Sequence, residues 1–243
     1  VDARQLGYYV AAVNIVELFS IFPVALMFTM LPILAKIVLE KERLDHYISL
    51  SFRYLTILAF GICTVVTLGS STIIALLYGR QYSPSVPVIS ILIWSSFGVF
   101  LVVVINVVLL VKGLQKFIPL SASLGAVINV VLNLLLIPKW GIRGAAWATV
   151  ISYSVVGAFA FLFIPATRSL AFKGIKISVF PFFTALFCII ILSPFPRPVS
   201  IALAPALYMV ALFILKAWKG NDYRLIFDTI RSIRTENNFK PTY

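Results

Sequence analysis

Long apolar runs that are almost free of charge dominate this sequence. Charged residues, proline and glycine separate seven such runs, and only the first run contains a charged side chain, Glu17. About 20 apolar residues are enough to cross a bilayer as a helix, whereas a lone strand would leave its backbone groups unpaired in lipid. The sequence therefore predicts an all-α, polytopic transmembrane bundle. The expected spans are residues 8–34, 54–78, 86–111, 117–137, 144–165, 177–192 and 199–215.

Composition agrees with a membrane protein and argues against an enzyme. Hydrophobic residues make up 61% of the chain and charged residues 12%, whereas soluble domains average about half and a quarter. The two cysteines, Cys63 and Cys188, lie in apolar runs and indicate buried thiols. With one histidine and no phosphate-binding glycine loop, we expect no metal site, no cofactor and no catalytic activity.

The distribution of basic residues predicts the orientation of the spans. Of the 20 Lys and Arg residues, five fall on the side of the N-terminus and fifteen on the opposite side. Because basic residues accumulate in cytoplasmic loops, we expect the N-terminus outside and the C-terminus in the cytoplasm.

The net charge of +12 indicates contact with anionic lipids, because no stretch is large enough for a basic nucleic-acid-binding domain. We expect two parts: a transmembrane bundle over residues 1–218 and a basic amphipathic cytoplasmic tail over residues 219–243. Residues 41–52 also have an apolar face and are expected to lie in the cytoplasmic interface.

Glu17 lies near the middle of the first expected span, where a charged carboxylate is costly unless it is paired or protonated. Asn14 precedes it by three residues and is expected on the same helix face. Two interpretations stay open. Glu17 is either a neutral acid that hydrogen-bonds a neighbouring helix or a cation- or proton-coupling site that faces a cavity.

The fourth and fifth expected spans carry small and polar side chains along one face. In the fourth span, Ser121, Gly125, Asn129 and Asn133 follow one another at intervals of four residues. Such a strip favours close helix packing, and cavity lining by the two asparagines is the alternative. The fifth span offers a packing counterpart in Gly144, Ala145 and Ala148.

Several motifs resemble a known family. The segment 132–138 ends in Ile-Pro, and Gly141-Ile-Arg-Gly-Ala-Ala-Trp-Ala-Thr149 follows it. The first span (Gly7-Tyr-Tyr, Glu17, Pro23, Pro32) and the turn 78–82 match as well. Over residues 7 to about 155 the chain resembles the polysaccharide-unit flippases of the multidrug/oligosaccharidyl-lipid/polysaccharide exporter superfamily.

The resemblance implies one lobe of a two-lobe transporter, with this chain as the C-terminal lobe and the N-terminal lobe of the same protein as its partner. It also implies flipping of a polyprenyl-diphosphate-linked oligosaccharide across the bacterial inner membrane by alternating access, during surface polysaccharide (such as lipopolysaccharide) biosynthesis. A polysaccharide polymerase or glycosyltransferases are further expected partners. The cavity is expected to include Asn14, Glu17, Asn129 and Asn133. Asn14 stands where relatives often have a basic or polar residue, and as an amide it cannot neutralise a phosphate.

Two alternatives remain at this stage. An ion-coupled multidrug or cation antiporter of the same superfamily would share the fold and would confer resistance to toxic cations. A non-transporting scaffold of a glycan-assembly complex would depend on the basic tail and not on Glu17.

Overall fold

The computed structural model describes residues 2–162 and 164–214, and in these ranges all the regular structure is helical. The predicted all-α fold is thereby confirmed. The expected tail, residues 219–243, lies outside the described residues. The elements are α1 (Ala3–Lys36), α2 (Lys41–Tyr78), η1 (Arg80–Ser85), α3 (Val86–Leu92), α4 (Ser95–Val111), α5 (Phe117–Trp140), α6 (Ile142–Leu162), α7 (Pro165–Leu192) and α8 (Arg197–Ile214).

Local chemistry explains where the helices begin and end. The side chain of Asp2 caps α1 by accepting a hydrogen bond from the Gln5 backbone N–H at 2.7 Å. Helix α2 ends at Gly79, whose φ of 82° is accessible to glycine at little cost. Gly141, with φ 56°, likewise allows the sharp turn between α5 and α6.

Five helices in the described ranges are long and apolar enough to cross a membrane, and a bent pair, α3 with α4, makes a sixth span if it counts as one. Helix α6 has 21 residues, about 32 Å at 1.5 Å per residue. This helix is not among those candidates, so the fifth expected span, residues 144–165, stays a prediction. The expected third span is not one straight helix, because α3 and α4 meet at an angle of 46°.

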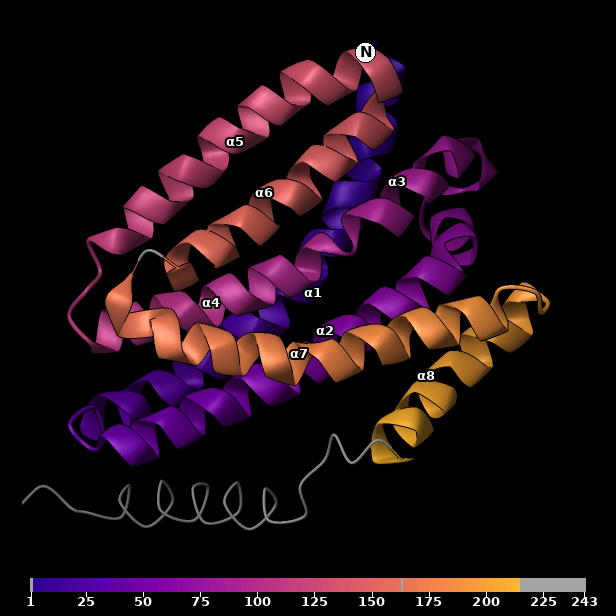
Figure 1. Cartoon of the computed structure of the whole chain (residues 1–243). Coiled ribbons are helices and arrows are strands. Elements are labelled where there is room, and N and C mark those ends of the chain that lie inside the picture. The colour runs from indigo at the N-terminus through magenta and orange to yellow at the C-terminus, as the bar shows by residue number, and fades with distance from the viewer. Residues whose placement is uncertain (1, 163, 215–243) are drawn as a thin grey trace, which may run out of the picture.

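The turns gather at two ends of the bundle. Figure 1 shows the α1–α2 and α4–α5 turns at one end, and the α2–α3, α5–α6 and α7–α8 connections at the other. This arrangement agrees with the two groups of loops, one rich and one poor in Lys and Arg, that the sequence predicts on opposite sides. Which side faces the cytoplasm stays a prediction.

Helix α2 is the central element of the core. It buries apolar side chains against α1 and α4 at one end and against α1 and α3 at the other. A third cluster joins its middle to α7 and α8 through Phe60, Cys188 and Tyr208. Both cysteines are free and buried, so the prediction of buried thiols is confirmed.

The structure corrects the interpretation of residues 41–52. They do not form a separate surface element but are the first turns of α2. Their apolar face, which includes Leu44, Tyr47 and Ile48, is buried in the core beside Met27 and Leu34 of α1. Amphipathic periodicity identified the buried face correctly, but periodicity cannot distinguish a protein neighbour from a lipid surface.

Candidate functional site

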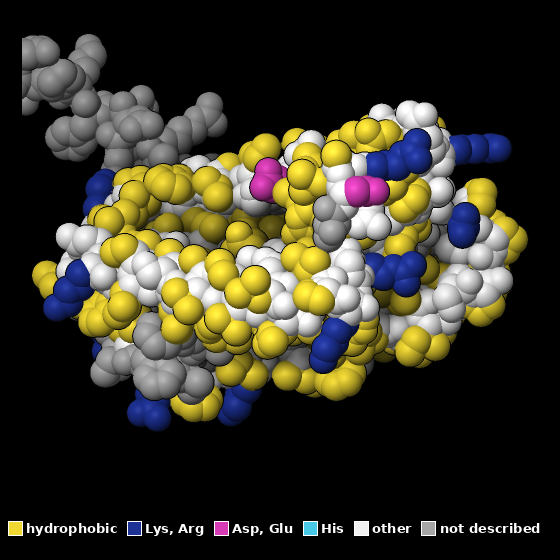
Figure 2. All heavy atoms as spheres, turned by 90° about the horizontal axis from the view of Figure 1, so that it is seen from above, with side chains coloured by type: hydrophobic (Ala, Val, Ile, Leu, Met, Phe, Trp, Pro, Cys, Tyr) yellow, Lys and Arg dark blue, Asp and Glu magenta, His cyan; other side chains and the backbone are white. Residues whose placement is uncertain are grey.

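A polar cavity of about 460 Å³ lies between α1, α6 and the junction of α3 with α4. Its volume falls in the range of about 300–1,000 Å³ that is usual for small-molecule sites. The face of the bundle seen from above is mostly hydrophobic and is hollowed between its helices (Figure 2). The cavity is lined by Tyr9, Val13, Val16, Glu17, Ser20, Leu92, Ser95, Ser96, Val99, Phe100, Thr149 and Tyr153.

Glu17 is the charged member of this lining. Its side chain is exposed to the cavity, and the described residues provide no ion-pair partner for it. The hydrogen bond from Ser20 Oγ, at 2.6 Å, goes to the backbone carbonyl of Glu17 and leaves the carboxylate unused. Of the two sequence interpretations, the structure therefore places Glu17 at a cavity instead of in a helix contact.

The bend between α3 and α4 supplies two serines to the same cavity. Ser95 Oγ donates to the carbonyl of Leu92 at 2.7 Å, and Cys63 Sγ donates to the carbonyl of Ile93 at 3.3 Å. These two bonds satisfy backbone carbonyl groups at the break between α3 and α4, where the regular helical hydrogen bonds are interrupted. Ser96 differs, because its side chain is buried and its hydroxyl has no hydrogen-bond partner.

A hydrogen bond connects α1 with α6 at this cavity. The hydroxyl groups of Tyr9 and Thr149 lie 3.2 Å apart, and Thr149 also donates to the carbonyl of Ala145 at 3.1 Å. Because the one hydroxyl proton of Thr149 goes to Ala145, the Tyr9 hydroxyl donates to Thr149, and this bond fixes the Tyr9 ring at the edge of the cavity.

A second cavity of about 440 Å³ lies on the other side of α6, against α4 and α5. Thr149 and Tyr153 line both cavities, so the two spaces share these side chains. Asn129 lines the second cavity and accepts a hydrogen bond from Asn133 Nδ2 at 2.8 Å. The Oδ1 atom of Asn133 is buried without a partner.

The four expected cavity residues are thus not brought into one cavity. Glu17 lines the first cavity and Asn129 the second, while Asn133 contacts Asn129. Asn14 is exposed and lines neither of these two cavities. A separation of three residues turns a helix by about 60° from exact alignment, and this is enough to point Asn14 away from α4 and α6.

The small residues lie at the contact between α5 and α6. A Cβ atom on Gly125 would collide with the side chain of Val156, and one on Gly144 would collide with the backbone carbonyl of Leu136. Ser121 is buried and donates to the carbonyl of Ile118 at 2.9 Å. Ala148 is fully buried, whereas Ala145 is half-buried and its carbonyl accepts the Thr149 bond.

Sequence reasoning missed Tyr9, Ser96 and Tyr153. The adjacent serines at 95 and 96 interrupt an otherwise apolar span, and this interruption was an available signal. The position of Tyr153 had no local signal. It follows from the close approach of α4 to α6, where a Cβ on Gly98 would lie 2.9 Å from Cβ of Tyr153.

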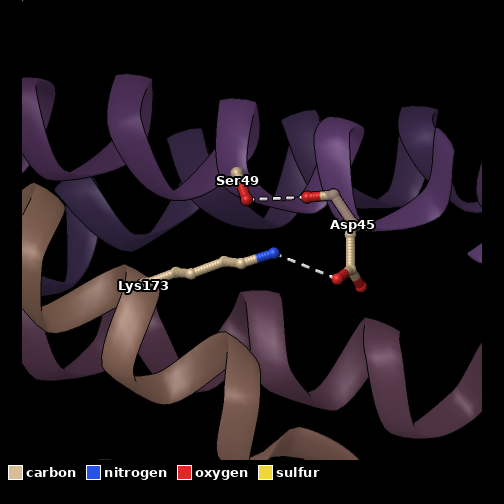
Figure 3. Close-up of polar contacts among 3 residues, drawn as sticks. All are labelled: Asp45, Ser49 and Lys173. Atoms are coloured by element: carbon tan, nitrogen blue, oxygen red, sulfur yellow. Dashed lines mark hydrogen bonds and ion pairs between the residues drawn. The ribbon is translucent and has the colours of Figure 1, made fainter. Parts of the chain in front are cut away.

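At the basic end of the bundle a polar contact joins α2 with α7. Lys173 Nζ donates to Asp45 Oδ2 at 3.1 Å, and Ser49 Oγ donates to the carbonyl of Asp45 at 2.6 Å (Figure 3). Glu42, His46 and Arg53 lie around the same hollow. This cluster mixes both signs of charge and is remote in sequence from the residues of the two polar cavities.

Comparison with known proteins agrees with the predicted resemblance. Residues 1–87 match the sequence profile of a family described as "Polysaccharide biosynthesis protein". An uncharacterized membrane protein of Methanocaldococcus jannaschii is 29% identical over 127 residues, which are 51% of this chain and 24% of that protein.

The fold is that of a solved flippase. The structure of the lipid II flippase MurJ in an inward closed conformation matches with a TM-score of 0.69 at 14% identity, over 87% of this chain and 47% of that chain. The chain therefore spans about half of the flippase and about a quarter of the archaeal protein. The predicted resemblance is thus confirmed at two levels: residues 1–87 match a family of polysaccharide biosynthesis proteins, and the described chain has the fold of a lipid II flippase.

Proposed function

We propose that this chain forms one lobe of a transporter that flips a lipid-linked oligosaccharide unit across the bacterial inner membrane during surface polysaccharide biosynthesis. The observation that carries the proposal is the polar cavity with an unpaired Glu17, in a chain with a flippase fold. Flipping moves the substrate without breaking a bond, so the lobe needs binding groups and a change of shape but no catalytic group.

The position of Glu17 supports a transport role. It lies 14 residues beyond the start of α1, about 21 Å along a helix of 34 residues. A charge at such depth costs about 2.5–3.5 kcal/mol on insertion scales, and acids retained there usually serve ion or substrate pathways. We propose that Glu17 binds a proton or another cation during the transport cycle.

The remaining polar groups of the cavity suit sugar hydroxyls. The hydroxyl oxygens of Tyr9, Ser20 and Thr149 can accept hydrogen bonds from sugar hydroxyl groups, while their own protons are bonded within the protein. A few polar groups placed on an apolar lining are the usual composition of a small-molecule site.

The diphosphate of the substrate requires other contacts. Among the residues that the structure describes, no Lys, Arg or His lines either of the two polar cavities. We propose that an N-terminal lobe, which would complete a transporter of about twice this length, supplies the basic groups. Anionic lipids would meet the basic ends of α1, α2, α4, α5 and α7, and polysaccharide polymerase or glycosyltransferases are proposed partners of the complete transporter.

The test depletes the full-length parent protein in cells and measures which membrane leaflet holds the lipid-linked oligosaccharide. We expect the oligosaccharide to accumulate in the cytoplasmic leaflet, and we expect expression of the wild-type protein to relieve this accumulation. Glu17→Gln should not relieve the accumulation, because a neutral amide cannot bind a proton or a cation as a carboxylate does. Glu42→Gln, an exposed acid outside both cavities, is the matched control and should relieve it.

An unchanged leaflet distribution after depletion would rule out flipping. If the protein instead confers resistance to toxic cations, it is an antiporter of the same superfamily. Full relief by Glu17→Gln, with the flippase activity otherwise established, would remove the coupling role of Glu17 alone. If glycan assembly requires residues 219–243 but not Glu17, the protein acts as a scaffold.

A further inference from the structure

Within the described part of the chain, the two polar cavities beside α6 together contain one acidic side chain and no basic one. Glu17 contributes the negative charge, and the shared residues Thr149 and Tyr153 are uncharged. A carboxylate or phosphate group bound in the first cavity would therefore face Glu17 without a compensating cation. Like charges that meet in a partly desolvated site are strongly unfavourable and act against the wrong ligand.

Ser96 adds a second, independent indication of a ligand. Its side chain is only 3% exposed, it lines the first cavity, and its hydroxyl lacks a partner within the described chain. Buried polar groups are nearly always hydrogen-bonded, so an exception at a cavity wall requires an explanation, and a ligand in the cavity would supply the missing partner. The neighbouring Ser95 shows the contrast, because its hydroxyl is already bonded to the carbonyl of Leu92.

Two tyrosines also line the first cavity. Tyr9 and Tyr153 combine an apolar ring with a hydroxyl group, so they can cover the C–H face of a sugar and still bond its edge. Glu17, when ionised, accepts hydrogen bonds from hydroxyl or ammonium groups but donates none. The lining is thus complementary to a ring that carries donors and no negative charge.

We propose that the cavity beside Glu17 and Ser96 is a sugar subsite that selects a neutral or amino sugar and rejects a sugar that carries a carboxylate or phosphate. The inference rests on the proposed function and specifies its substrate class. Glu17 accepts hydrogen bonds from hydroxyl or amino groups of the sugar, and Ser96 bonds one further hydroxyl.

The test uses the purified full-length transporter in nanodiscs and two synthetic polyprenyl-diphosphate disaccharides. The two probes differ only in the terminal sugar, which is glucose in one and glucuronate in the other. We expect the glucose probe to bind at least about tenfold more tightly, because the carboxylate of the other probe would meet Glu17. Glu17→Gln should narrow this difference by improving the binding of the glucuronate probe.

Ser96→Ala should weaken binding of the glucose probe by about three- to tenfold, the effect of one lost hydrogen bond. Its thermal unfolding temperature should not fall, since the hydroxyl has no partner in the protein. Thr67→Val is the matched control, because the Thr67 hydroxyl is also buried and unpaired but lies on α2 outside both cavities. This variant should bind like the wild type.

Equal affinity for the two probes, or identical binding by the Ser96→Ala and Thr67→Val variants, would overturn the subsite. Continued movement of the glucose probe across proteoliposomes in that case would leave the flippase function standing. Binding of neither probe would contradict the subsite and the proposed function together.

Discussion

At the scale of single residues, Gly144 shows how closely α5 and α6 approach one another. A Cβ atom at this position would collide with the backbone carbonyl of Leu136, which cannot move aside as a flexible side chain can. Gly144→Ala should therefore destabilise the protein by about 1–3 kcal/mol, the usual cost of overpacking. Thermal unfolding of the full-length protein in detergent measures this loss.

Gly7→Ala is the matched control for that substitution. Gly7 also lies within a helix, but a Cβ there meets nothing within 4 Å. Because alanine loses less backbone entropy than glycine in a helix, this variant should be stabilised by about 0.5–1 kcal/mol. Equal effects at both positions would mean that α5 and α6 are not in such close contact.

At the scale of helices, Asp45 and Lys173 connect α2 with α7 at the basic end of the bundle. The Lys173 side chain is 51% exposed, so solvent screens the pair and its contribution is expected to be at most about 1 kcal/mol. A double-mutant cycle with Asp45→Asn and Lys173→Met, followed by thermal unfolding, measures the coupling. We expect a small coupling that declines further at high salt. A coupling of several kcal/mol would show a desolvated pair instead.

The helices themselves were predictable, whereas the cavity was only partly so. Hydropathy and turn residues are local signals. They placed both ends of α1, α5, α6 and α8 to within about five residues, but α2 and α7 begin more than about ten residues before the spans expected there. The bend after α3 was missed because no proline or glycine marks it. Glu17 was found from its cost in a membrane, and the adjacent serines at 95 and 96 offered a signal that was missed. Tyr153 becomes a cavity residue only through the packing of α4 on α6, which the sequence alone does not reveal.

Orientation is a property of the whole molecule, and it predicts which ends are accessible from outside. Ser83, before α3, and Gln115, between α4 and α5, are both exposed and lie at opposite ends of the bundle. With the N-terminus outside, a membrane-impermeant thiol reagent should label Ser83→Cys in intact cells and label Gln115→Cys only after permeabilisation. The native cysteines should contribute little labelling because both are buried. The reverse pattern would invert the orientation.

The outer surface of α7 and α8 fits a bundle surrounded by lipid. An open groove of about 840 Å³ between them is lined almost wholly by apolar side chains, including Phe180, Phe183 and Phe187. Such an apolar surface is stable in hydrocarbon but would promote aggregation in water. The apolar hollow on α7 and α8 thus differs in chemistry from the polar cavity beside Glu17.

The most direct test of the central claim is translocation by the purified full-length protein in proteoliposomes. A fluorescent polyprenyl-diphosphate oligosaccharide is placed in the inner leaflet, and its arrival in the outer leaflet is followed with a membrane-impermeant quencher. We predict that the wild-type protein moves the probe under a proton or cation gradient and that Glu17→Gln moves it at least about tenfold more slowly, as expected when an intramembrane coupling acid is lost. Movement no faster than in protein-free liposomes would contradict the proposal that this chain belongs to a flippase.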